Sequence, residues 1–110
     1  MHALYKNFIL LIEKHFQKEH QVVFYSNALG ISTRNLIQIT VENCGYKPKE
    51  IIDNYLLQKS KTLLETTDLS INEVAMRMGF NSQATFCRFF VNNEGRTPSV
   101  YRDLYLTRFA

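Results

Sequence analysis

The chain contains few of the residues that interrupt helices. Its 110 residues include only four glycines and two prolines, and no segment shows the strict alternation of apolar and polar residues that is typical of a half-exposed strand. Because these features are scarce, a β-rich fold is disfavoured. Hydrophobic residues make up 45% of the chain, yet no apolar run approaches the roughly 18 residues of a membrane-spanning helix. The sequence therefore predicts an all-α chain, long enough for one domain or for two very small units that share a core.

The sequence also lacks the residue patterns of catalytic and metal sites. Cys44 and Cys87 stand alone, and neither they nor the three histidines have the spacing of a metal site. No nucleophile–base pair and no glycine-rich phosphate loop is visible. Residues 1–16 are amphipathic and charged, unlike a signal peptide. We therefore expect a reduced, cytoplasmic chain that is not an enzyme and that has neither a cofactor nor a membrane partner.

The net charge of +3 is unevenly distributed along the chain. Residues 1–76 contain eight Lys and Arg against eight Asp and Glu, so this part is neutral. Residues 77–110 contain five arginines against Glu94 and Asp103, so the whole excess of +3 lies in the last third. Such an excess is a modest indication of an anionic partner, although a solvated basic face is at least as common.

Apolar residues recur at the 3.6-residue period of a helix along the whole chain. Serines suited to N-caps precede three of the expected helices, at Ser32, Ser70 and Ser82, and Ser70 forms a capping box with Glu73. The expected helices cover roughly residues 3–19, 22–29, 32–44, 48–66, 70–78, 81 or 82 to 94, and from 98 onward. Their inward faces are expected to carry Leu4, Phe8, Leu11, Ile12, His15 or Phe16; Val22, Tyr25, Ser26, Leu29; Leu36, Ile39 or Thr40, Asn43; Ile52, Tyr55, Leu56, Lys59 (through its methylenes), Leu63, Leu64; Ile71, Val74, Ala75, Met78; Phe86, Phe89, Phe90; and Val100, Tyr101, Leu104, Tyr105.

The second half of the chain repeats the punctuation of the first half. The stretch ENCGYKP returns 50 residues later as NNEGRTP, which places Gly45 and Gly95 at equivalent positions, and likewise Pro48 and Pro98. In both copies the glycine is suited to end one helix and the proline to begin the next. The chain therefore contains the same structural unit twice.

Each copy has the layout of a helix-turn-helix: a short helix, a turn at a glycine and a second helix of about 13 residues. Alignment of the copies places Ser26 opposite Ala75 and Gly30 opposite Gly79, with one extra residue in the second turn. A small residue four positions before the turn glycine lets the two helices cross closely. Short helix pairs also occur in all-helical domains that bind nothing, but two pairs in register favour a double helix-turn-helix.

The repeat divides the chain into three segments. We expect a first helix-turn-helix subdomain at residues 1–47, a connecting helix at 48–67 and a second subdomain at 68–110. A connecting helix of about 19 residues is roughly 28 Å long, which is comparable to the roughly 34 Å between successive major grooves on one face of DNA. The spacing therefore predicts that one chain can place two recognition helices in adjacent major grooves.

The last third of the chain resembles a known family. The stretch INEVAMRMGFNSQATFCRFFVNNEGRTPSVYR is similar to the signature of AraC/XylS-type transcription regulators, G-F-x-S-x-x-x-F-x-R-x-F-x-x-x-x-G-x-x-P-x-x-Y-R. The signature positions here are Gly79, Phe80, Ser82, Phe86, Arg88, Phe90, Gly95, Pro98, Tyr101 and Arg102. The resemblance covers about residues 5–106 and implies the family's seven-helix DNA-binding domain in a transcriptional regulator. It implies double-stranded DNA and RNA polymerase as partners, and an N-terminal effector-binding domain in the full-length protein.

The chain departs from this family at cationic positions. Where the family usually has Arg and then Phe-Lys in its first motif, this chain has Gln38, Thr40 and Val41, and the usual lysine after Phe90 is Val91. The first recognition helix has thus lost two cations. An alternative therefore stays open, namely a protein-interaction module on the same fold with weak DNA binding. The family commonly carries an N-terminal ligand-binding domain, and here the first expected helix begins almost immediately after Met1. We therefore expect a C-terminal fragment of a longer regulator in preference to a stand-alone member.

The residues expected to contact DNA bases lie on the outward faces of the two second helices. They are Thr33, Arg34, Asn35, Ile37 and Gln38 in the first motif, and Ser82, Gln83, Ala84, Thr85, Cys87 and Arg88 in the second. An arginine can pair with guanine, an amide can pair with adenine, and Ile37 can touch a thymine methyl group. Arg88 and Gln83 are favoured in the second motif. A solvated helix face is the alternative for each of them, above all for Asn35 and Cys87.

Contacts with the DNA backbone are expected near the helix junctions. The expected residues are Ser32, Lys47, Lys49, Arg96, Thr97 and Arg102. Helix N-termini near Ser32 and Ser82 can donate backbone N–H groups to phosphates. For Arg102 the rival interpretation is a structural ion pair with an acidic residue.

Overall fold

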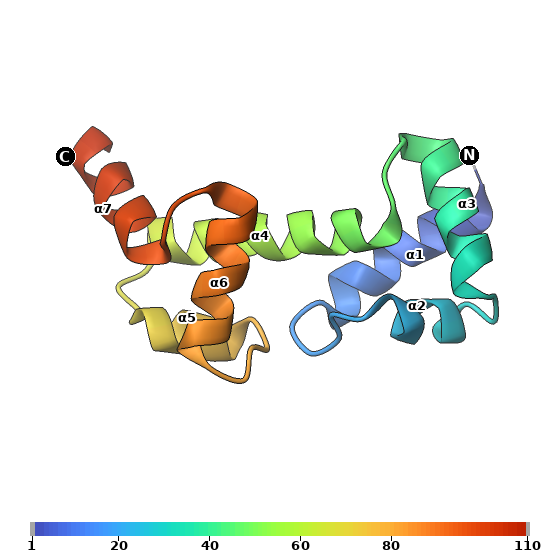
Figure 1. Ribbon diagram of the computed structural model, residues 1–110, viewed down its shortest axis with the longest axis horizontal. Coiled ribbons are helices and arrows are strands. Elements are labelled where there is room, and N and C mark those ends of the chain that lie inside the picture. The colour runs from blue at the N-terminus through green and yellow to red at the C-terminus, as the bar shows by residue number, and fades with distance from the viewer. Residues whose placement is uncertain (1, 110) are drawn as a thin grey trace. The chain divides into compact units, whose positions relative to one another are not determined.

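The computed structural model describes the backbone of residues 2–109 and the side chains of residues 2–106. Within this part of the chain there are seven α-helices and no strands (Figure 1). The helices are α1 Ala3–His15, α2 Val22–Ala28, α3 Thr33–Cys44, α4 Pro48–Thr66, α5 Ile71–Arg77, α6 Gln83–Glu94 and α7 Pro98–Phe109. The predicted all-α fold is therefore confirmed. None of the described helices is long and apolar enough to cross a membrane.

Three helices begin at the serines that the sequence indicated. Ser32, Ser70 and Ser82 are the N-caps of α3, α5 and α6, and each side-chain oxygen accepts a hydrogen bond from the backbone N–H three residues later. At α5 the Glu73 carboxylate also accepts from the Ser70 N–H, which completes the capping box. The two hydrogen bonds from Ser70 to this carboxylate hold the pKa of Glu73 below its usual value.

The first helix is shorter than the sequence predicted. It was expected to reach residue 19, but α1 ends at His15. The chain turns there because the backbone N–H groups of Lys18 and Glu19 both donate to the His15 carbonyl oxygen, at 3.0 and 2.9 Å. The apolar period continues for one more residue, Phe16, which acts as the C-cap.

Gly45 and Gly95 end α3 and α6 in the same way. Both have a left-handed backbone, with φ of 83° and 87°. Their N–H groups donate to the carbonyl oxygens of Val41 and Val91, at 2.9 and 2.8 Å. Glycine is preferred in this conformation because a Cβ atom would crowd the following carbonyl group.

The structure consists of two compact units, Met1–Tyr55 (unit 1) and Leu56–Ala110 (unit 2). The boundary lies inside α4. The segment that was expected to be a separate connecting helix therefore contributes its first half to unit 1 and its second half to unit 2.

The core of unit 1 is built from α1, α2, α3 and the start of α4. Its buried side chains include Phe8, Ile12, Tyr25, Ser26, Leu36, Ile39, Thr40 and Ile52. The rings of Phe8 and Tyr25 meet edge to face with centroids 5.6 Å apart. The Tyr25 hydroxyl donates to the Glu19 carbonyl oxygen at 2.8 Å. Burial and, secondarily, the charge of Glu19 raise the pKa of Tyr25 to about 12.

In the core of unit 2 the buried aromatic rings lie on α6, the second helix of the motif. Its buried side chains are Leu56, Leu57, Ser60, Leu64, Val74, Ala75, Met78, Phe86 and Phe90. Aromatic rings follow one another from Phe80 through Phe86 and Phe90 to Tyr101, with centroids 5.3, 5.9 and 5.6 Å apart. These rings join α6 to the turn before it and to α7. Phe86 and Phe90 are fully buried, as the sequence predicted.

The inward face of α7 differs from the prediction. Val100 and Leu104 were expected to be inward but are 47% and 50% exposed. Among the α7 side chains that the structure describes, those of residues 98–106, the buried or half-buried ones are Pro98, Tyr101, Arg102 and Tyr105. This face includes an arginine, and it excludes two apolar residues that the period alone had favoured.

Two further residues expected to be inward are exposed. Asn43 in α3 is exposed and donates its side-chain amide to the Ile39 carbonyl oxygen of its own helix, at 2.8 Å. Lys59 in α4 is also exposed, and the neighbouring Ser60 is fully buried in its place. A small serine fits this position because its hydroxyl donates to the Leu56 carbonyl oxygen at 2.7 Å, which satisfies the polar group within the helix.

Candidate nucleic-acid interface

The two helix-turn-helix motifs share one set of backbone hydrogen bonds. In the first turn the Ile31 N–H donates to the Ser26 carbonyl oxygen, and in the second turn the Phe80 N–H donates to the Ala75 carbonyl oxygen, both at 3.0 Å. The turn glycine of each motif also donates to the carbonyl oxygen three residues before it, at 3.0 and 3.1 Å. Ser26 and Ala75 are both buried, as close crossing of the two helices requires.

The second turn contains the extra residue that the alignment indicated. The turn glycines Gly30 and Gly79 are followed by the N-caps Ser32 and Ser82, so one residue separates glycine from cap in the first motif and two residues in the second. The capping bonds are nevertheless the same, with the Asn35 and Thr85 N–H groups each 3.1 Å from the serine oxygen. The two turns therefore differ in length by one residue, but α3 and α6 begin with the same capping geometry.

The outward face of α3 carries the side chains that the sequence assigned to it. Thr33, Arg34, Asn35, Ile37 and Gln38 are all exposed. The Gln38 amide nitrogen donates one hydrogen bond to Glu42 at 3.1 Å, which leaves its carbonyl oxygen and its second N–H for a ligand. Val41, one turn beyond Ile37, is 44% exposed, so this face also has an apolar strip.

The outward face of α6 is more varied. Gln83, Ala84, Thr85 and Arg88 are exposed, whereas Ser82 and Cys87 are half-buried. The Ser82 and Thr85 hydroxyls are 2.9 Å apart and share a hydrogen bond. Burial raises the pKa of Cys87, so its thiol stays protonated at neutral pH. Cys87 can therefore offer a small, weakly polar surface but no charge.

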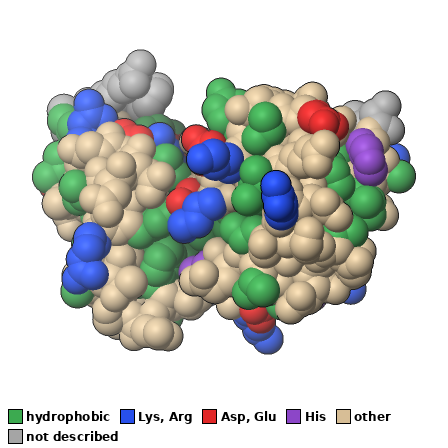
Figure 2. All heavy atoms as spheres, turned by 45° about the vertical axis from the view of Figure 1, so that its right-hand side comes forward, with side chains coloured by type: hydrophobic (Ala, Val, Ile, Leu, Met, Phe, Trp, Pro, Cys, Tyr) green, Lys and Arg blue, Asp and Glu red, His purple; other side chains and the backbone are tan. Residues whose placement is uncertain are grey.

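Each recognition helix presents one arginine. Arg34 lies on the first turn of α3, and Arg88 lies on the second turn of α6. Among the described residues neither guanidinium has a hydrogen-bond or ion-pair partner. On the face in Figure 2, Lys and Arg side chains are scattered and several stand beside carboxylates. The positive charges of Arg34 and Arg88 are therefore not neutralised by a neighbouring carboxylate among the described residues.

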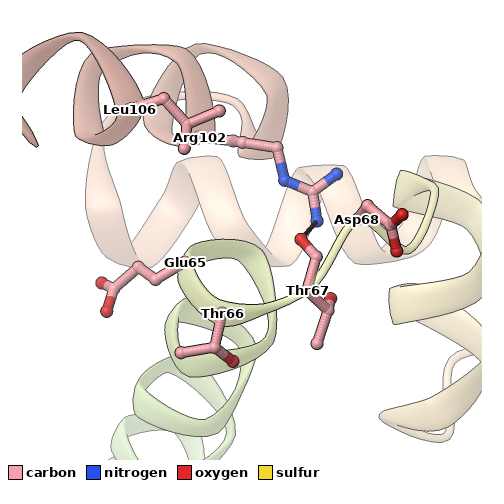
Figure 3. A pocket seen from close by; sticks show the side chains of 6 residues that line it. All are labelled: Glu65, Thr66, Thr67, Asp68, Arg102 and Leu106. Carbon is pink, nitrogen blue, oxygen red and sulfur yellow. Dashed lines mark hydrogen bonds between the residues drawn. The ribbon is translucent and has the colours of Figure 1, made fainter. Parts of the chain in front are cut away.

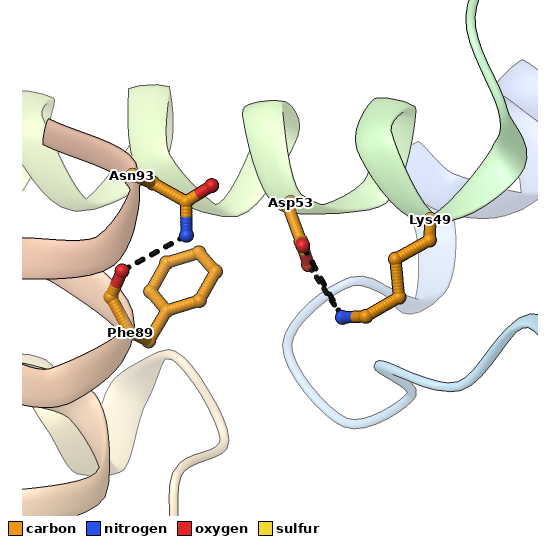
Figure 4. A network of polar contacts seen from close by, with 4 residues as sticks. All are labelled: Lys49, Asp53, Phe89 and Asn93. Atoms are coloured by element: carbon orange, nitrogen blue, oxygen red, sulfur yellow. Dashed lines mark hydrogen bonds and ion pairs between the residues drawn. The ribbon is translucent and has the colours of Figure 1, made fainter.

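The cations at the helix junctions differ in their surroundings. Lys49 pairs with Asp53 at 3.0 Å, one turn further along α4 (Figure 4); the Lys49 side chain is exposed and the Asp53 side chain is half-buried. Glu50 accepts from the Lys47 N–H at 3.0 Å, so the N-terminus of α4 already has an acidic cap. At the start of α7 the cap is the uncharged Thr97, whose hydroxyl accepts from the Val100 N–H at 3.2 Å.

Asn93 also satisfies its side chain locally. Its amide donates to the Phe89 carbonyl oxygen at 2.9 Å, within α6 (Figure 4). Asn93 and Asn43 are 50 residues apart, and both donate to the carbonyl group four residues earlier. The repeat therefore extends to side chains in the last turns of both recognition helices.

Arg102, which was expected to contact phosphate, makes hydrogen bonds within unit 2. Its Nε donates to the Leu64 carbonyl oxygen at 3.0 Å, Nη1 to that of Leu69 at 2.6 Å, and Nη2 to that of Thr67 at 3.2 Å. Figure 3 shows the guanidinium turned toward the segment that follows α4. The carbonyl groups at a helix C-terminus lack partners within the helix, and the planar fork of donors satisfies several of them at once. The rival interpretation, an ion pair, is replaced, since all three acceptors are backbone oxygens.

Sequence reasoning missed a charged cluster at the end of α6. The Lys61 Nζ lies 2.7 Å from Glu94 Oε2, and the Arg96 Nη1 lies 3.2 Å from Glu94 Oε1. Lys61 is in α4 and Glu94 is the last residue of α6, 33 positions later. No local spacing pairs two residues so far apart, so the sequence held no signal for this cluster.

Residues 25–103 match the family described as "Helix-turn-helix domain". The match runs from α2 into α7 and includes both motifs. The chain belongs to the AraC-type helix-turn-helix family. The resemblance noted in the signature residues is thereby confirmed.

Curated relatives of this AraC-type domain are longer proteins. The Xylose operon regulatory protein of Escherichia coli K12 is 34% identical over 93 residues, which are 84% of this chain and 24% of the relative. The Histidine kinase P4 of Formosa agariphila is 27% identical over 106 residues, which are 96% of this chain and 8% of the relative. The chain thus spans less than a quarter of the length of either relative.

Solved structures share the AraC-type fold. The DNA-binding domain of AdpA, described as a global transcriptional factor in complex with a target DNA, has a TM-score of 0.84 and 25% identity, over 98% of this chain and 96% of that one. The xylose-binding transcription activator xylR has a TM-score of 0.77 and 31% identity, over 94% of this chain and 27% of that one.

Proposed function

We propose that this AraC-type domain binds double-stranded DNA sequence-specifically as part of a transcriptional regulator, with α3 and α6 in adjacent major grooves. One observation carries the proposal: each motif presents an exposed recognition helix with an arginine that has no partner among the described residues. An unpaired guanidinium beside uncharged hydrogen-bonding groups suits the major groove, where base edges offer acceptors and donors. The DNA complex of the AdpA domain supports the same role for this fold.

The side chains of α3 favour a mixed polar and apolar set of base contacts. Arg34 on the first turn can donate two hydrogen bonds to guanine O6 and N7. Gln38 gives one amide N–H to Glu42, and its free oxygen is suited to accept from the exocyclic amine of adenine or cytosine. Ile37 is exposed beside it and can contact a thymine methyl group. Thr33 and Asn35 complete the exposed first turn of this helix.

In α6 the arginine lies one turn further along the helix. Arg88 occupies the position equivalent to Gln38, and Gln83 lies on the first turn. We therefore infer that the two helices favour different base patterns, with guanine read at the start of α3 and in the middle of α6. Ala84 and Thr85 add small exposed surfaces to the first turn. Cys87, half-buried and uncharged, is suited to van der Waals contact only.

Contacts with phosphate are proposed chiefly at the start of α7. Arg96 and Thr97 stand there, and the first turn of α7 contains no acidic residue. Arg96 shares the Glu94 carboxylate with Lys61, whereas Lys49 is the only cation paired with Asp53 among the described residues, and the start of α4 is capped by Glu50. An acid at a helix N-terminus lowers the attraction for a phosphate. We therefore keep Lys47 and Lys49 as weaker candidates than Arg96, while the backbone N–H groups after the Ser32 and Ser82 caps are candidates in both motifs.

A second function, a protein-interaction module with weak DNA binding, has one observation in its favour. Ile37, Val41 and Val91 are 40%, 44% and 38% exposed on the recognition helices. Such positions suit a protein surface as well as a thymine-rich groove. The arginines beside them favour DNA, so we rank this alternative second.

Selection from a random duplex pool with the 110-residue chain tests the proposal. The expected result is enrichment of two short base patterns about one helical turn apart. Affinity for the enriched duplex should exceed affinity for a scrambled duplex and should fall as salt rises. Lys14→Ala, which removes an exposed cation from α1, is the charge-matched control for Arg88→Ala. A pool that yields no pattern, with no salt-dependent binding, would favour the protein-interaction module.

The setting of the domain is also part of the proposal. Since its curated relatives are several times longer, we propose that it works as the C-terminal, DNA-binding part of a longer cytoplasmic regulator. Its further partners would be an N-terminal effector-binding domain and RNA polymerase. Its activity is binding, with no catalytic step proposed.

A further inference from the structure

The charged cluster at the end of α6 consists of one exposed cation, Arg96, and two largely buried ionic groups, Lys61 and Glu94. The Glu94 carboxylate lies between Lys61 on one oxygen, at 2.7 Å, and Arg96 on the other, at 3.2 Å. The Lys61 and Glu94 side chains are only 20% and 14% exposed, whereas the Arg96 side chain is 52% exposed. Of the three groups, therefore, only Arg96 is open to a large ligand.

Lys61 is held in the cluster from a second direction. Its ammonium lies 5.5 Å from the centre of the Tyr101 ring, a distance at which the ring face attracts a cation. The Tyr101 hydroxyl donates in turn to Glu65, one helical turn from Lys61 on α4. Burial first, and then this hydrogen bond, raise the pKa of Tyr101, so the phenol stays protonated and the ring stays neutral. Lys61 is thus directed into the unit and away from a bound ligand.

Lys61 neutralises Glu94 and so leaves the positive charge of Arg96 uncompensated. With Lys61 present, the three side chains carry +1, and that charge is exposed on Arg96. Without Lys61, Glu94 and Arg96 would cancel. Glu94 also lies at the C-terminal end of α6, where the helix dipole is already negative. A phosphate approaching this surface would then meet a neutral or negative region.

We propose that Lys61 and Glu94 are positioning residues for a phosphate contact made by Arg96. Lys61 neutralises Glu94, and Glu94 Oε1 fixes the guanidinium before DNA arrives, so that less side-chain freedom is lost on binding. This inference rests on the proposed function and adds two residues to it, neither of which touches DNA.

The same device is missing from the first motif. Fifty residues earlier, the positions equivalent to Glu94 and Arg96 are Cys44 and Tyr46, an uncharged pair. A carboxylate that orients one cation while a second cation neutralises it is therefore found at these positions in unit 2 and not in unit 1, and residues 77–110 of unit 2 also carry the excess positive charge of the chain.

A three-variant series tests the proposal on the duplex enriched by selection. Lys61→Met keeps most of the aliphatic stem and removes the charge. It should lower affinity about 5-fold at 0.15 M salt and reduce the salt slope by about one unit, the effect of one lost phosphate contact. Arg96→Ala should have a similar effect. Lys61→Met with Glu94→Gln loses the same ion pair but returns the net charge to +1, so affinity and salt slope should recover most of the loss.

The double variant tests whether Lys61 acts by neutralising the Glu94 charge. If Lys61 contacts phosphate itself, or if the ion pair matters only for folding, the double variant will bind as weakly as Lys61→Met, and the proposal is overturned. Thermal unfolding of both variants shows whether they share the same loss of stability. If the unmodified chain shows no salt-dependent duplex binding at all, the proposed function fails. If the unmodified chain binds DNA and Lys61→Met binds equally well, only this inference fails.

Discussion

The helix-turn-helix of α2 and α3 and that of α5 and α6 have the same backbone hydrogen bonds around different side chains. In unit 1 the buried aromatic residue of the motif is Tyr25, on the first helix, and the recognition helix contributes Leu36 and Thr40. In unit 2 the first helix contributes Val74 and Ala75, and the recognition helix contributes Phe86 and Phe90. The buried aromatic side chains of the motif therefore lie on its first helix in unit 1 and on its second helix in unit 2.

This difference shows which features specify the motif. The caps, the turn glycines and a small residue at the helix crossing are kept, because each satisfies a backbone group or a close approach that most residue types satisfy less well. Core volume can be supplied from either helix, since packing requires filled space and not a particular residue at a particular position. The outward-facing side chains also differ between the halves, which allows one fold to contact two different base patterns.

Replacing Phe90 with Ala should give the largest effect, and it should destabilise unit 2 more than the change at the equivalent position, Thr40, destabilises unit 1. The ring is fully buried and contacts Phe86 and Tyr101 at centroid distances of 5.9 and 5.6 Å. Its loss should lower the free energy of unfolding by about 3–5 kcal/mol. The matched change in unit 1, Thr40→Ala, removes far less volume and should cost roughly 1–2 kcal/mol.

Denaturant unfolding of both variants measures this difference. Equal losses for Phe90→Ala and Thr40→Ala would mean that the aromatic residues of α6 are not the main support of unit 2.

The second comparison concerns DNA affinity. Arg88→Ala with Arg96→Ala removes two exposed cations from unit 2, and Arg34→Ala with Lys47→Ala removes two from unit 1. The unit 2 pair should weaken duplex binding more, because this half has the net positive charge and the oriented Arg96. Each lost phosphate contact should also lower the salt slope by about one unit.

Titration of both double variants on one duplex, at two salt concentrations, decides the ranking. Since the pairs are matched in charge, the reverse order would show that the distribution of charge is a poor guide to affinity in this fold.

Whether a contact could be predicted from the sequence depended on how far apart along the chain its residues lie. Caps such as Ser70 and C-terminal glycines such as Gly95 were correct, because their signals lie within a few residues. The inward face of α7 was wrong at Val100 and Leu104, because apolar character does not require burial. The Arg102 contacts and the Lys61–Glu94 pair join residues about 33 to 38 positions apart, and no periodicity indicates such pairs.

The exposure of most residues in the candidate site could be predicted from the sequence. Thr33, Arg34 and Gln38 are exposed as expected, because a recognition helix is defined by its turn and by the buried residues on its other face. Exposure was the only property of these side chains that the sequence could predict. Which bases these side chains contact stays a prediction.

Arg88 provides a narrower test of the same contrast. Its guanidinium is opposite the buried Phe86 and Phe90 and is suited to bidentate pairing with guanine. Arg88→Ala should therefore cost about 1–3 kcal/mol on the preferred site and remove the preference at one base pair. Measurements use the selected site and its single-base variants, with Lys14→Ala as the control. Equal weakening on every sequence, with a salt slope lower by about one unit, would make Arg88 a phosphate contact and leave Gln83 as the main base contact of α6.

The smallest effect should come from the feature in which the two halves agree. Gly45 and Gly95 have nearly the same left-handed backbone, and a Cβ built on either meets no other atom within 4 Å. Substitution by alanine should therefore cost only the conformational penalty, about 1 kcal/mol at each site. Because the penalty depends on φ and not on the surrounding side chains, Gly45→Ala and Gly95→Ala should lose equal stability although they lie in different units. Thermal unfolding of the two variants checks this equality. A loss at one site that clearly exceeds the other would show that the two turns differ in more than their side chains, and that the repeat of backbone geometry does not extend to its energetics.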